Sequence, residues 1–398
     1  MRNFLIQDIK SLIVVEVLLF IGIGVAVFVG FNIGGSSTGV AFGPAVGSGL
    51  VSKLFAAGLM TTFALLGAWT AGREVIETMG GQIVPRGQFT LAASVAVLFF
   101  VGMALLISNT FGVPASTSMT AVGAIAGLGV ASGTLNEAVM LEIVSWWIVA
   151  PVLAFWICAV VGRYLYPYLD ARLKLNRSPG PLITLNRSGT VPQVRRGPNT
   201  SNRELGSVCL VIIIACYMAY SAGASNAANA VAPLVGNGSV SMNIGIVLAT
   251  GAIGLGAFTI ARRTLDTVGN DLTELPILAA LVVETVSASV IAVLSMLGIP
   301  ASLAVSATMC IVGLGWGRAT RTVTIGDAIG GEKPEMSVDA LTAETDKTVP
   351  NVGEESPQEL TDQTLFDPGT TGRVIFFWLL TPSVSAVASY VLFTLTPL

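Results

Sequence analysis

Histidine is absent from the 398-residue chain, and charged residues make up only 11% of it. Without histidine the chain lacks the commonest metal ligand, and it lacks every catalytic arrangement built on a Ser–His or Cys–His pair. The charged share lies far below the roughly 25% of a soluble globular domain. These absences argue against a soluble enzyme, and no enzymatic activity is predicted.

Cysteine is also scarce. The four cysteines all lie within apolar stretches, and none of them forms a Cys-x-x-Cys pair. A disulfide framework or a zinc site would need paired spacing. We therefore expect buried, unreactive thiols, and the sequence predicts no cofactor.

Apolar residues dominate the chain, at 53% of its length with a mean hydropathy of +0.79. Apolar stretches of about 20 residues recur, and each is long enough to cross a hydrocarbon core as a helix. The sequence therefore predicts an all-α polytopic membrane protein. Lipid is then an obligatory partner.

Residues of the first half recur at a constant offset in the second half, which is typical of duplicated transporter folds. The pairs at an offset of 189 include Gly34/Gly223, Pro44/Pro233, Gly47/Gly236, Gly49/Gly238 and Arg73/Arg262. The pairs at an offset of 186 include Gly112/Gly298, Pro114/Pro300, Ser116/Ser302 and Gly127/Gly313. Trp147 and Pro151 are matched by Trp378 and Pro382.

The Gly/Ser-rich segments 32–50 and 221–238 predict re-entrant or broken helices. Each half then makes five crossings, and an odd number forces the second half to be inverted. We expect two inverted repeats with about 10 crossing helices, or about 12 helices when the broken segments are counted. Most of the 20 Lys and Arg residues then lie inside, with both termini outside a cell membrane and the central loop cytoplasmic.

Composition divides the chain into five parts. They are a first transmembrane repeat at 1–162, a basic cytoplasmic linker at 163–206, the first part of the second repeat at 207–326, an acidic disordered cytoplasmic insertion at 327–372, and a last transmembrane helix at 373–398.

Two kinds of segment could hold an anion. Glycine lets backbone amides approach a ligand, a broken helix offers an N-terminus, and hydroxyls and amides donate hydrogen bonds without adding charge. The candidate residues are Gly34, Gly35, Ser36, Ser37, Thr38, Gly223, Ser225 and Asn226, together with Ser116, Thr117, Ser118 and Ser302 at the start of two short helices. The alternatives are that the small residues only permit close helix packing, and that the hydroxyls only bond their own helix.

Few ionisable residues interrupt the apolar stretches, and Glu284 is the strongest candidate for cation coupling. Candidate side chains for this role are Asn32, Asn226, Asn229 and Glu284. A sodium ion could use Asn226, Asn229 and Glu284 together.

The segment SAGASNAANAVAP at 221–233 resembles the duplicated GANDVANA signature of the inorganic phosphate transporter (PiT) family. The segment GVPASTS at 112–118 is similar to that family's Pro-x-Ser-Thr-Thr element, and the Trp–Pro pairs also fit. The resemblance covers nearly the whole chain. It implies a cation-coupled phosphate importer with two inverted repeats.

The sequence departs from the family pattern at the signature acids. Ser225-Asn226 and Ser36-Ser37 stand where the family has Asn-Asp, so both aspartates are missing, while the later signature asparagine is kept as Asn229. The segment NIGGSS at 32–37 is similar to sequences of the sulfate-permease branch of the family. Sulfate carries no proton near neutral pH, which suits a neutral site rich in donors.

The sequence thus predicts a secondary active symporter that imports a tetrahedral inorganic oxyanion, coupled to Na⁺ or H⁺. Phosphate is the family's substrate and sulfate is the alternative. A passive anion channel could use the same residues, and uphill uptake would distinguish it. No nucleic-acid partner is predicted, and a homodimer is left open.

Overall fold

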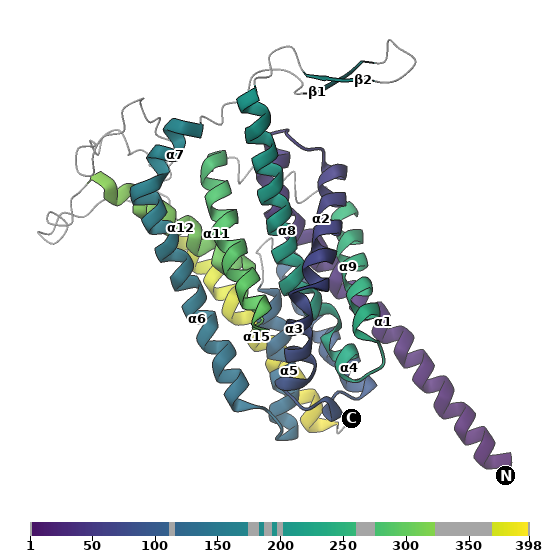
Figure 1. The fold of residues 1–398 in the computed structure, drawn as a ribbon. Coiled ribbons are helices and arrows are strands. Elements are labelled where there is room, and N and C mark those ends of the chain that lie inside the picture. Colours follow the sequence, from purple (N-terminus) through teal and green to yellow (C-terminus); the bar gives the residue numbers. More distant parts are fainter. Residues whose placement is uncertain are drawn as a thin grey trace, which may run out of the picture.

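The computed structural model describes residues 2–110, 116–173, 183–186, 193–196, 202–259, 275–322 and 368–396. In these residues the protein is a bundle of long helices (Figure 1), which confirms the all-α expectation. Seven of the described helices are long and apolar enough to cross a membrane, or up to eight if a bent pair counts as one span.

In chain order, the α-helices of the described residues are α1 Arg2–Gly47, α2 Lys53–Trp69, α3 Gly72–Glu77, α4 Leu91–Thr110, α5 Thr117–Ser132, α6 Glu137–Val160, α7 Tyr166–Leu173, α8 Asn202–Gly236, α9 Met242–Thr259, α11 Ile277–Met296, α12 Leu303–Ala319 and α15 Pro368–Leu395. Short π-helices span Thr78–Gln82 (η1) and Val161–Leu165 (η3), and short 3₁₀ helices span Arg86–Gln88 (η2) and Thr320–Thr322 (η5).

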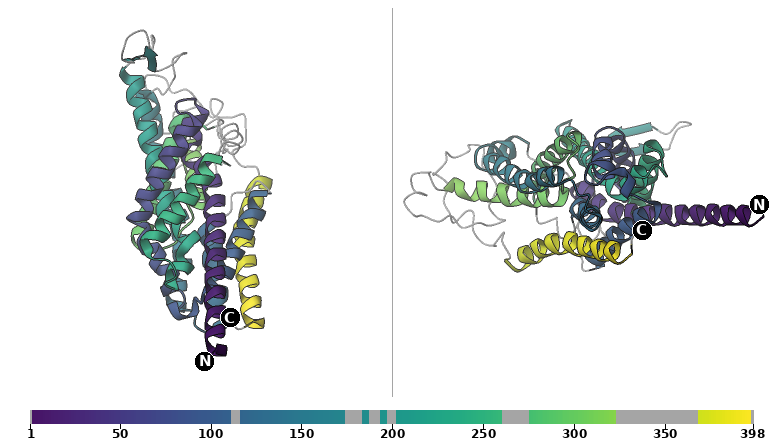
Figure 2. Two further views of the ribbon diagram at one scale, coloured as in Figure 1. Left: turned by 90° about the vertical axis from the view of Figure 1, so that its right-hand side faces the viewer. Right: turned by 90° about the horizontal axis from the view of Figure 1, so that it is seen from below.

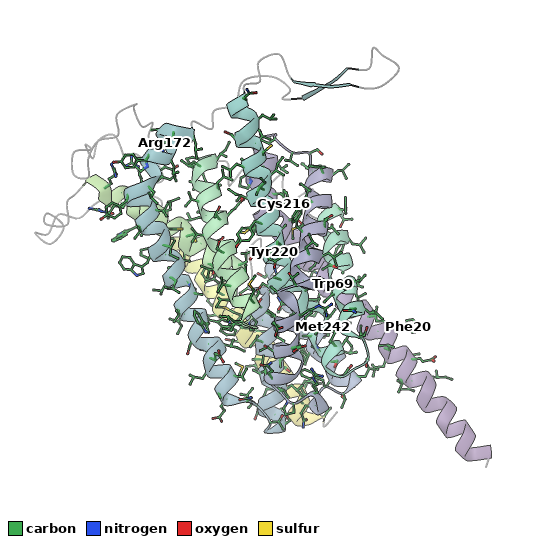
Figure 3. All side chains as sticks on the ribbon, viewed as in Figure 1. Phe20, Trp69, Arg172, Cys216, Tyr220 and Met242 are labelled. Carbon is green, nitrogen blue, oxygen red and sulfur yellow. The ribbon has the colours of Figure 1, made fainter. Side chains whose placement is uncertain are left out.

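The segment expected as a linker contains two short strands, β1 Ile183–Asn186 and β2 Gln193–Arg196, paired antiparallel. They lie at one end of the bundle, and the chain ends of α1 and α15 lie at the other (Figure 1). The first turns of α1 project beyond the bundle, as Figure 2 shows. Phe20, labelled in Figure 3, lies on this part of α1 and has an exposed side chain.

The expectation of broken helices at 32–50 and 221–238 was wrong. Helix α1 continues to Gly47 and α8 continues to Gly236, so both Gly/Ser-rich segments are helical. Hydroxyls in α1 bond the carbonyls of their own preceding turn, as Thr38 Oγ1 does with Gly34 O at 2.7 Å. Gly34, Gly223 and Gly236 lie directly against neighbouring backbone, which approaches too closely for a larger side chain.

The chain turns after these helices rather than inside them. Gly49 and Gly238 adopt φ values of 67° and 78°, a left-handed conformation that favours glycine. A bend of 66° instead separates α2 from the α3–η1 segment. At this bend Thr70 Oγ1 lies 2.8 Å from the Tyr220 hydroxyl of α8, labelled in Figure 3.

A glycine in each half packs closely against a helix of the other half: α1 against α9, and α8 against α2. A Cβ atom on Gly34 would lie 1.9 Å from Ile253 O of α9, and one on Gly223 would lie 2.1 Å from Ala64 O of α2. Ile253 is 189 positions after Ala64, just as Gly223 is 189 positions after Gly34.

The later helices of each half make the same kind of contact: α5 packs against α15, and α12 against α6. A Cβ atom on Gly127 of α5 would lie 2.3 Å from Ala386 O of α15, and one on Gly313 of α12 would lie 2.2 Å from Phe155 O of α6. Each helix therefore approaches backbone of the opposite half at matched positions. Such approaches leave room for no side chain larger than hydrogen.

Some expectations lie outside the described residues. These include Pro114 before α5, Arg262, and nearly all of the acidic insertion expected at 327–372. The five-part division of the chain stays a prediction.

Candidate functional site

Polar side chains from two distant parts of the chain meet in the last third of α8. Ser225, Asn226 and Asn229 lie on α8, and Thr117 and Ser118 form the first turn of α5. Asn229 is 1% exposed. These five residues are called the α5–α8 cluster below.

Hydrogen bonds connect the whole α5–α8 cluster. Thr117 Oγ1 donates to Asn226 Oδ1 at 2.6 Å. The Asn229 side-chain nitrogen lies 3.2 Å from both Thr117 Oγ1 and Ser118 Oγ. Ser118 Oγ lies 3.4 Å from Ser225 Oγ. Sequence reasoning named these residues from two separate motifs, and the fold brings the two motifs together.

The turn before α12 joins the cluster as a third element. Ser225 Oγ donates to Ala301 O at 2.8 Å, and Trp147 Nε1 of α6 donates to Pro300 O at 2.8 Å. Ser302 then caps α12 by accepting a bond from a first-turn amide at 3.3 Å. Sequence reasoning missed the role of Ala301, and the recurrence of Trp147 as Trp378 was the one signal for the tryptophan.

The start of α5 supplies the positive helix end that the broken helices were expected to supply. Ser116 caps α5 by accepting a bond from Met119 N at 3.4 Å. The amides of Thr117 and Ser118 have no acceptor within their helix because they occupy its first turn. Free amides and the helix dipole together favour an anion at this place.

The charge and bonding state of the cluster limit what it can hold. No carboxylate hydrogen-bonds to it in the part of the chain that the structure describes. The Asn229 side-chain oxygen is buried without a hydrogen-bond partner. The first-turn amides of α5 can therefore bind an anion, and the Asn229 oxygen offers one acceptor to a cation or to a protonated oxygen. The hydroxyls of Thr117 and Ser225 already donate to protein oxygens.

The predicted residues of α1 serve mainly in packing and in bonds within their helix. Gly34 packs against the α9 backbone, and Ser36 Oγ lies 3.1 Å from Ile33 O, which it can bond. The Ser37 hydroxyl makes no hydrogen bond within the described residues. Across the described ranges, no hydrogen bond joins Ser36, Ser37 or Thr38 to the α5–α8 cluster.

The remaining candidates are placed as follows. Asn32 donates to Phe28 O at 2.8 Å, Gly35 is buried, and Gly223 faces the backbone of Ala64. Glu284 lies on α11, where its side chain is 4% exposed. None of the hydrogen bonds of the cluster reaches it.

Comparison with known proteins assigns the chain to a family. The model of the Phosphate transporter family matches residues 33–389. The sulfate permease CysP of Bacillus subtilis is 30% identical over 291 residues, covering 73% of this chain and 75% of that protein. A protein of Pyrococcus furiosus, provisionally named a phosphate permease, is 24% identical over 355 residues. The match covers 73% of this chain and 85% of that protein.

A solved structure supports the fold. The chain described as the sodium-dependent phosphate transporter superposes with a TM-score of 0.63 at 19% identity, covering 94% of this chain and 99% of that one. The apolar helices and the family together make this an integral membrane protein. The matched region spans most of the chain, including the α5–α8 cluster, and the chain therefore belongs to the phosphate transporter family.

Proposed function

We propose that this protein is a secondary active transporter, not an enzyme, and that it imports a tetrahedral inorganic oxyanion together with a cation. The observation that carries the proposal is the α5–α8 cluster, where the free amides of a helix start meet buried hydroxyl and amide groups. The cluster lies in the last third of α8, a helix that is long enough to span a membrane.

Phosphate is the first candidate for the anion because the chain belongs to the phosphate transporter family. Sulfate is the second candidate, and one observation favours it. The described cluster has no carboxylate that could accept the proton of monohydrogen phosphate, whereas sulfate needs only donors. The relative at 30% identity is named a sulfate permease.

The side-chain oxygen of Asn229 and the carboxylate of Glu284 are proposed as the groups that couple a cation to transport. Both are buried, and an oxygen of each lacks a hydrogen-bond partner. They lie on different helices, so we propose two separate roles rather than one shared sodium site. A passive channel would need neither group, and its uptake would stop at equal concentrations on both sides.

Two inverted repeats are proposed as the basis of alternating access. The reciprocal approaches of Gly34 to Ile253 and of Gly223 to Ala64 support this, because a two-fold axis between the halves would generate such pairs. Ten crossings and a homodimer remain part of this proposal. The exposed apolar side chains of the outer helices, such as Leu141 of α6, suit contact with lipid.

The end of the bundle that carries β1 and β2 is proposed to face the cytoplasm. Arginines gather at this end, where Arg321 donates to Arg163 O at 2.8 Å and Arg318 lies buried nearby in the sequence. Basic residues favour the cytoplasmic side of membrane proteins. Both chain ends would then lie outside.

Thr117→Val is expected to reduce oxyanion uptake at least about tenfold, because it removes the hydroxyl that Asn226 and Asn229 both contact. Thr120→Val is the matched control in the same helix. Its hydroxyl bonds only Ser116 O, at 2.8 Å, so its uptake is expected to stay within about twofold of wild type. Equal losses in both variants would contradict the assigned site.

Competition uptake tests the proposed function. Membrane vesicles are supplied with labelled sulfate or labelled phosphate under an imposed cation gradient, and each unlabelled anion is added in excess. We expect one anion to accumulate and to be displaced by itself more strongly than by the other. Failure of both anions to enter under gradients of Na⁺ and of H⁺ would refute the proposal.

A further inference from the structure

Glu284 has an unusual environment for a carboxylate. It lies in the middle of α11, is 4% exposed, and has one carboxyl oxygen that is buried without a hydrogen-bond partner. Burying a lone charged carboxylate is costly, whereas the protonated carboxylic acid is much easier to bury.

The hydroxyls next to Glu284 do not hydrogen-bond to it. Thr285 Oγ1 donates to Leu281 O at 2.7 Å, and Ser287 Oγ donates to Val283 O at the same distance. Ser289 Oγ likewise donates to Thr285 O at 2.7 Å. These three hydroxyls are engaged with carbonyls of their own helix.

The helices packed against α11 carry thiols, phenols and charged side chains. Among the residues whose side chains the structure describes, the titratable and charged groups on the elements packed against it are Cys209, Cys216, Tyr217 and Tyr220 on α8, Cys310 and Arg318 on α12, Cys158, Glu137 and Glu142 on α6, Arg73, Glu74 and Glu77 on α3, and Glu16 on α1. Among the described residues none of these gives Glu284 a hydrogen bond or an ion pair.

Glu284 is also well separated from the α5–α8 cluster. Ser221 Oγ donates to Ala288 O at 3.0 Å, which sets α11 against α8. Ser225 lies one turn beyond Ser221, towards the end of α11, and Glu284 lies one turn before Ala288. The two sites are therefore about two turns apart, roughly 10 Å along the helices.

These observations distinguish between the two coupling ions. A hard cation needs a shell of several oxygen ligands, and within the described residues no hydrogen bond ties Glu284 to an oxygen-bearing side chain that could share a cation with it. A proton needs a single basic oxygen. We propose that Glu284 carries a proton and that this transporter couples oxyanion import to H⁺ rather than Na⁺.

The proton cycle follows from burial. The ionised carboxylate takes one proton from the outer solution, forming an O–H bond and a neutral group. The neutral carboxylic acid can be buried on α11, which packs against α8 and α12. It becomes ionised again when the proton leaves on the inner side. An ionised Glu284 and a bound anion would place two negative charges in the packed bundle, so inward movement of the anion-loaded protein requires the proton. The empty protein returns with the carboxylate ionised, which completes a cycle that carries one proton inward. This inference rests on the proposed transport function.

The test uses purified full-length protein in lipid vesicles that contain a pH-sensitive dye. Wild-type protein is expected to carry protons inward when sulfate or phosphate is added outside, and to accumulate the anion under an inwardly directed proton gradient without Na⁺. Glu284→Gln is expected to lower gradient-driven accumulation at least about tenfold and to abolish proton entry. Glu284→Asp is expected to restore part of both signals.

Glu142→Gln serves as the matched control, because Glu142 is exposed on α6 and should leave both signals at the wild-type level. Anion entry without proton entry in the wild type, or full proton entry in Glu284→Gln, would overturn the inference. Loss of anion counterflow in the wild type would refute the proposed function instead. If the wild-type protein exchanges anions but accumulates them only under a Na⁺ gradient, proton coupling is refuted and the proposed transport function is kept.

Discussion

Replacing Asn226 with aspartate is expected to lower sulfate uptake at least about 100-fold, while phosphate uptake falls far less. Asn226 accepts the Thr117 hydroxyl at 2.6 Å inside a buried cluster. A carboxylate at this place would repel a dianion that has no proton to share, whereas monohydrogen phosphate could donate its proton to it. Initial rates with each labelled anion measure the change in selectivity.

Asn136→Asp is the matched control for this charge change. Asn136 is exposed and caps α6 through its side-chain oxygen, a role that aspartate fulfils equally well. Its uptake of both anions is expected to match wild type. If Asn226→Asp reduced both anions to the same extent in well-folded protein, the cluster would not be what distinguishes them.

Gly34→Ala is expected to destabilise the protein by about 3 kcal/mol or more. Its new Cβ would lie 1.9 Å from Ile253 O, and a backbone atom cannot move aside without shifting α9. The reciprocal substitution Gly223→Ala should have a similar effect, because its Cβ would lie 2.1 Å from Ala64 O. Thermal unfolding in detergent measures both losses.

Gly24→Ala separates this collision from a general effect of glycine in a helix. Gly24 lies in the same helix with nothing within 4 Å of the added atom, so alanine should leave stability unchanged or raise it by up to about 1 kcal/mol. A Gly34→Ala protein as stable as Gly24→Ala would show that α1 and α9 do not pack this closely.

Sequence periodicity and the repeat predicted the helical elements well, because apolar length and capping residues are local signals. Ser116 and Ser302, which recur 186 positions apart, both cap short helices. The continuity of α1 and α8 was not predictable in the same way. Gly34 looks like a helix breaker in the sequence, and only the α9 backbone 219 positions later explains it.

The site was predicted in parts. The two motifs contributed Thr117, Ser118, Ser225, Asn226 and Asn229 without any signal that they would touch. Such contacts depend on how α5 approaches α8, which no local pattern encodes. The repeated motifs also suggested that both halves contribute equally to the anion site. The hydroxyls of Ser36 and Thr38 instead bond carbonyls of their own helix.

Uphill accumulation by the purified protein tests the central claim most directly. Lipid vesicles containing the protein receive labelled sulfate or phosphate at equal concentration on both sides, and an inward cation gradient is then imposed. Coupled transport predicts that the internal anion rises above the external concentration and that Thr117→Val lowers this rise at least about tenfold. Anion that only equilibrates across the membrane under every imposed gradient would contradict coupled transport and indicate a passive channel.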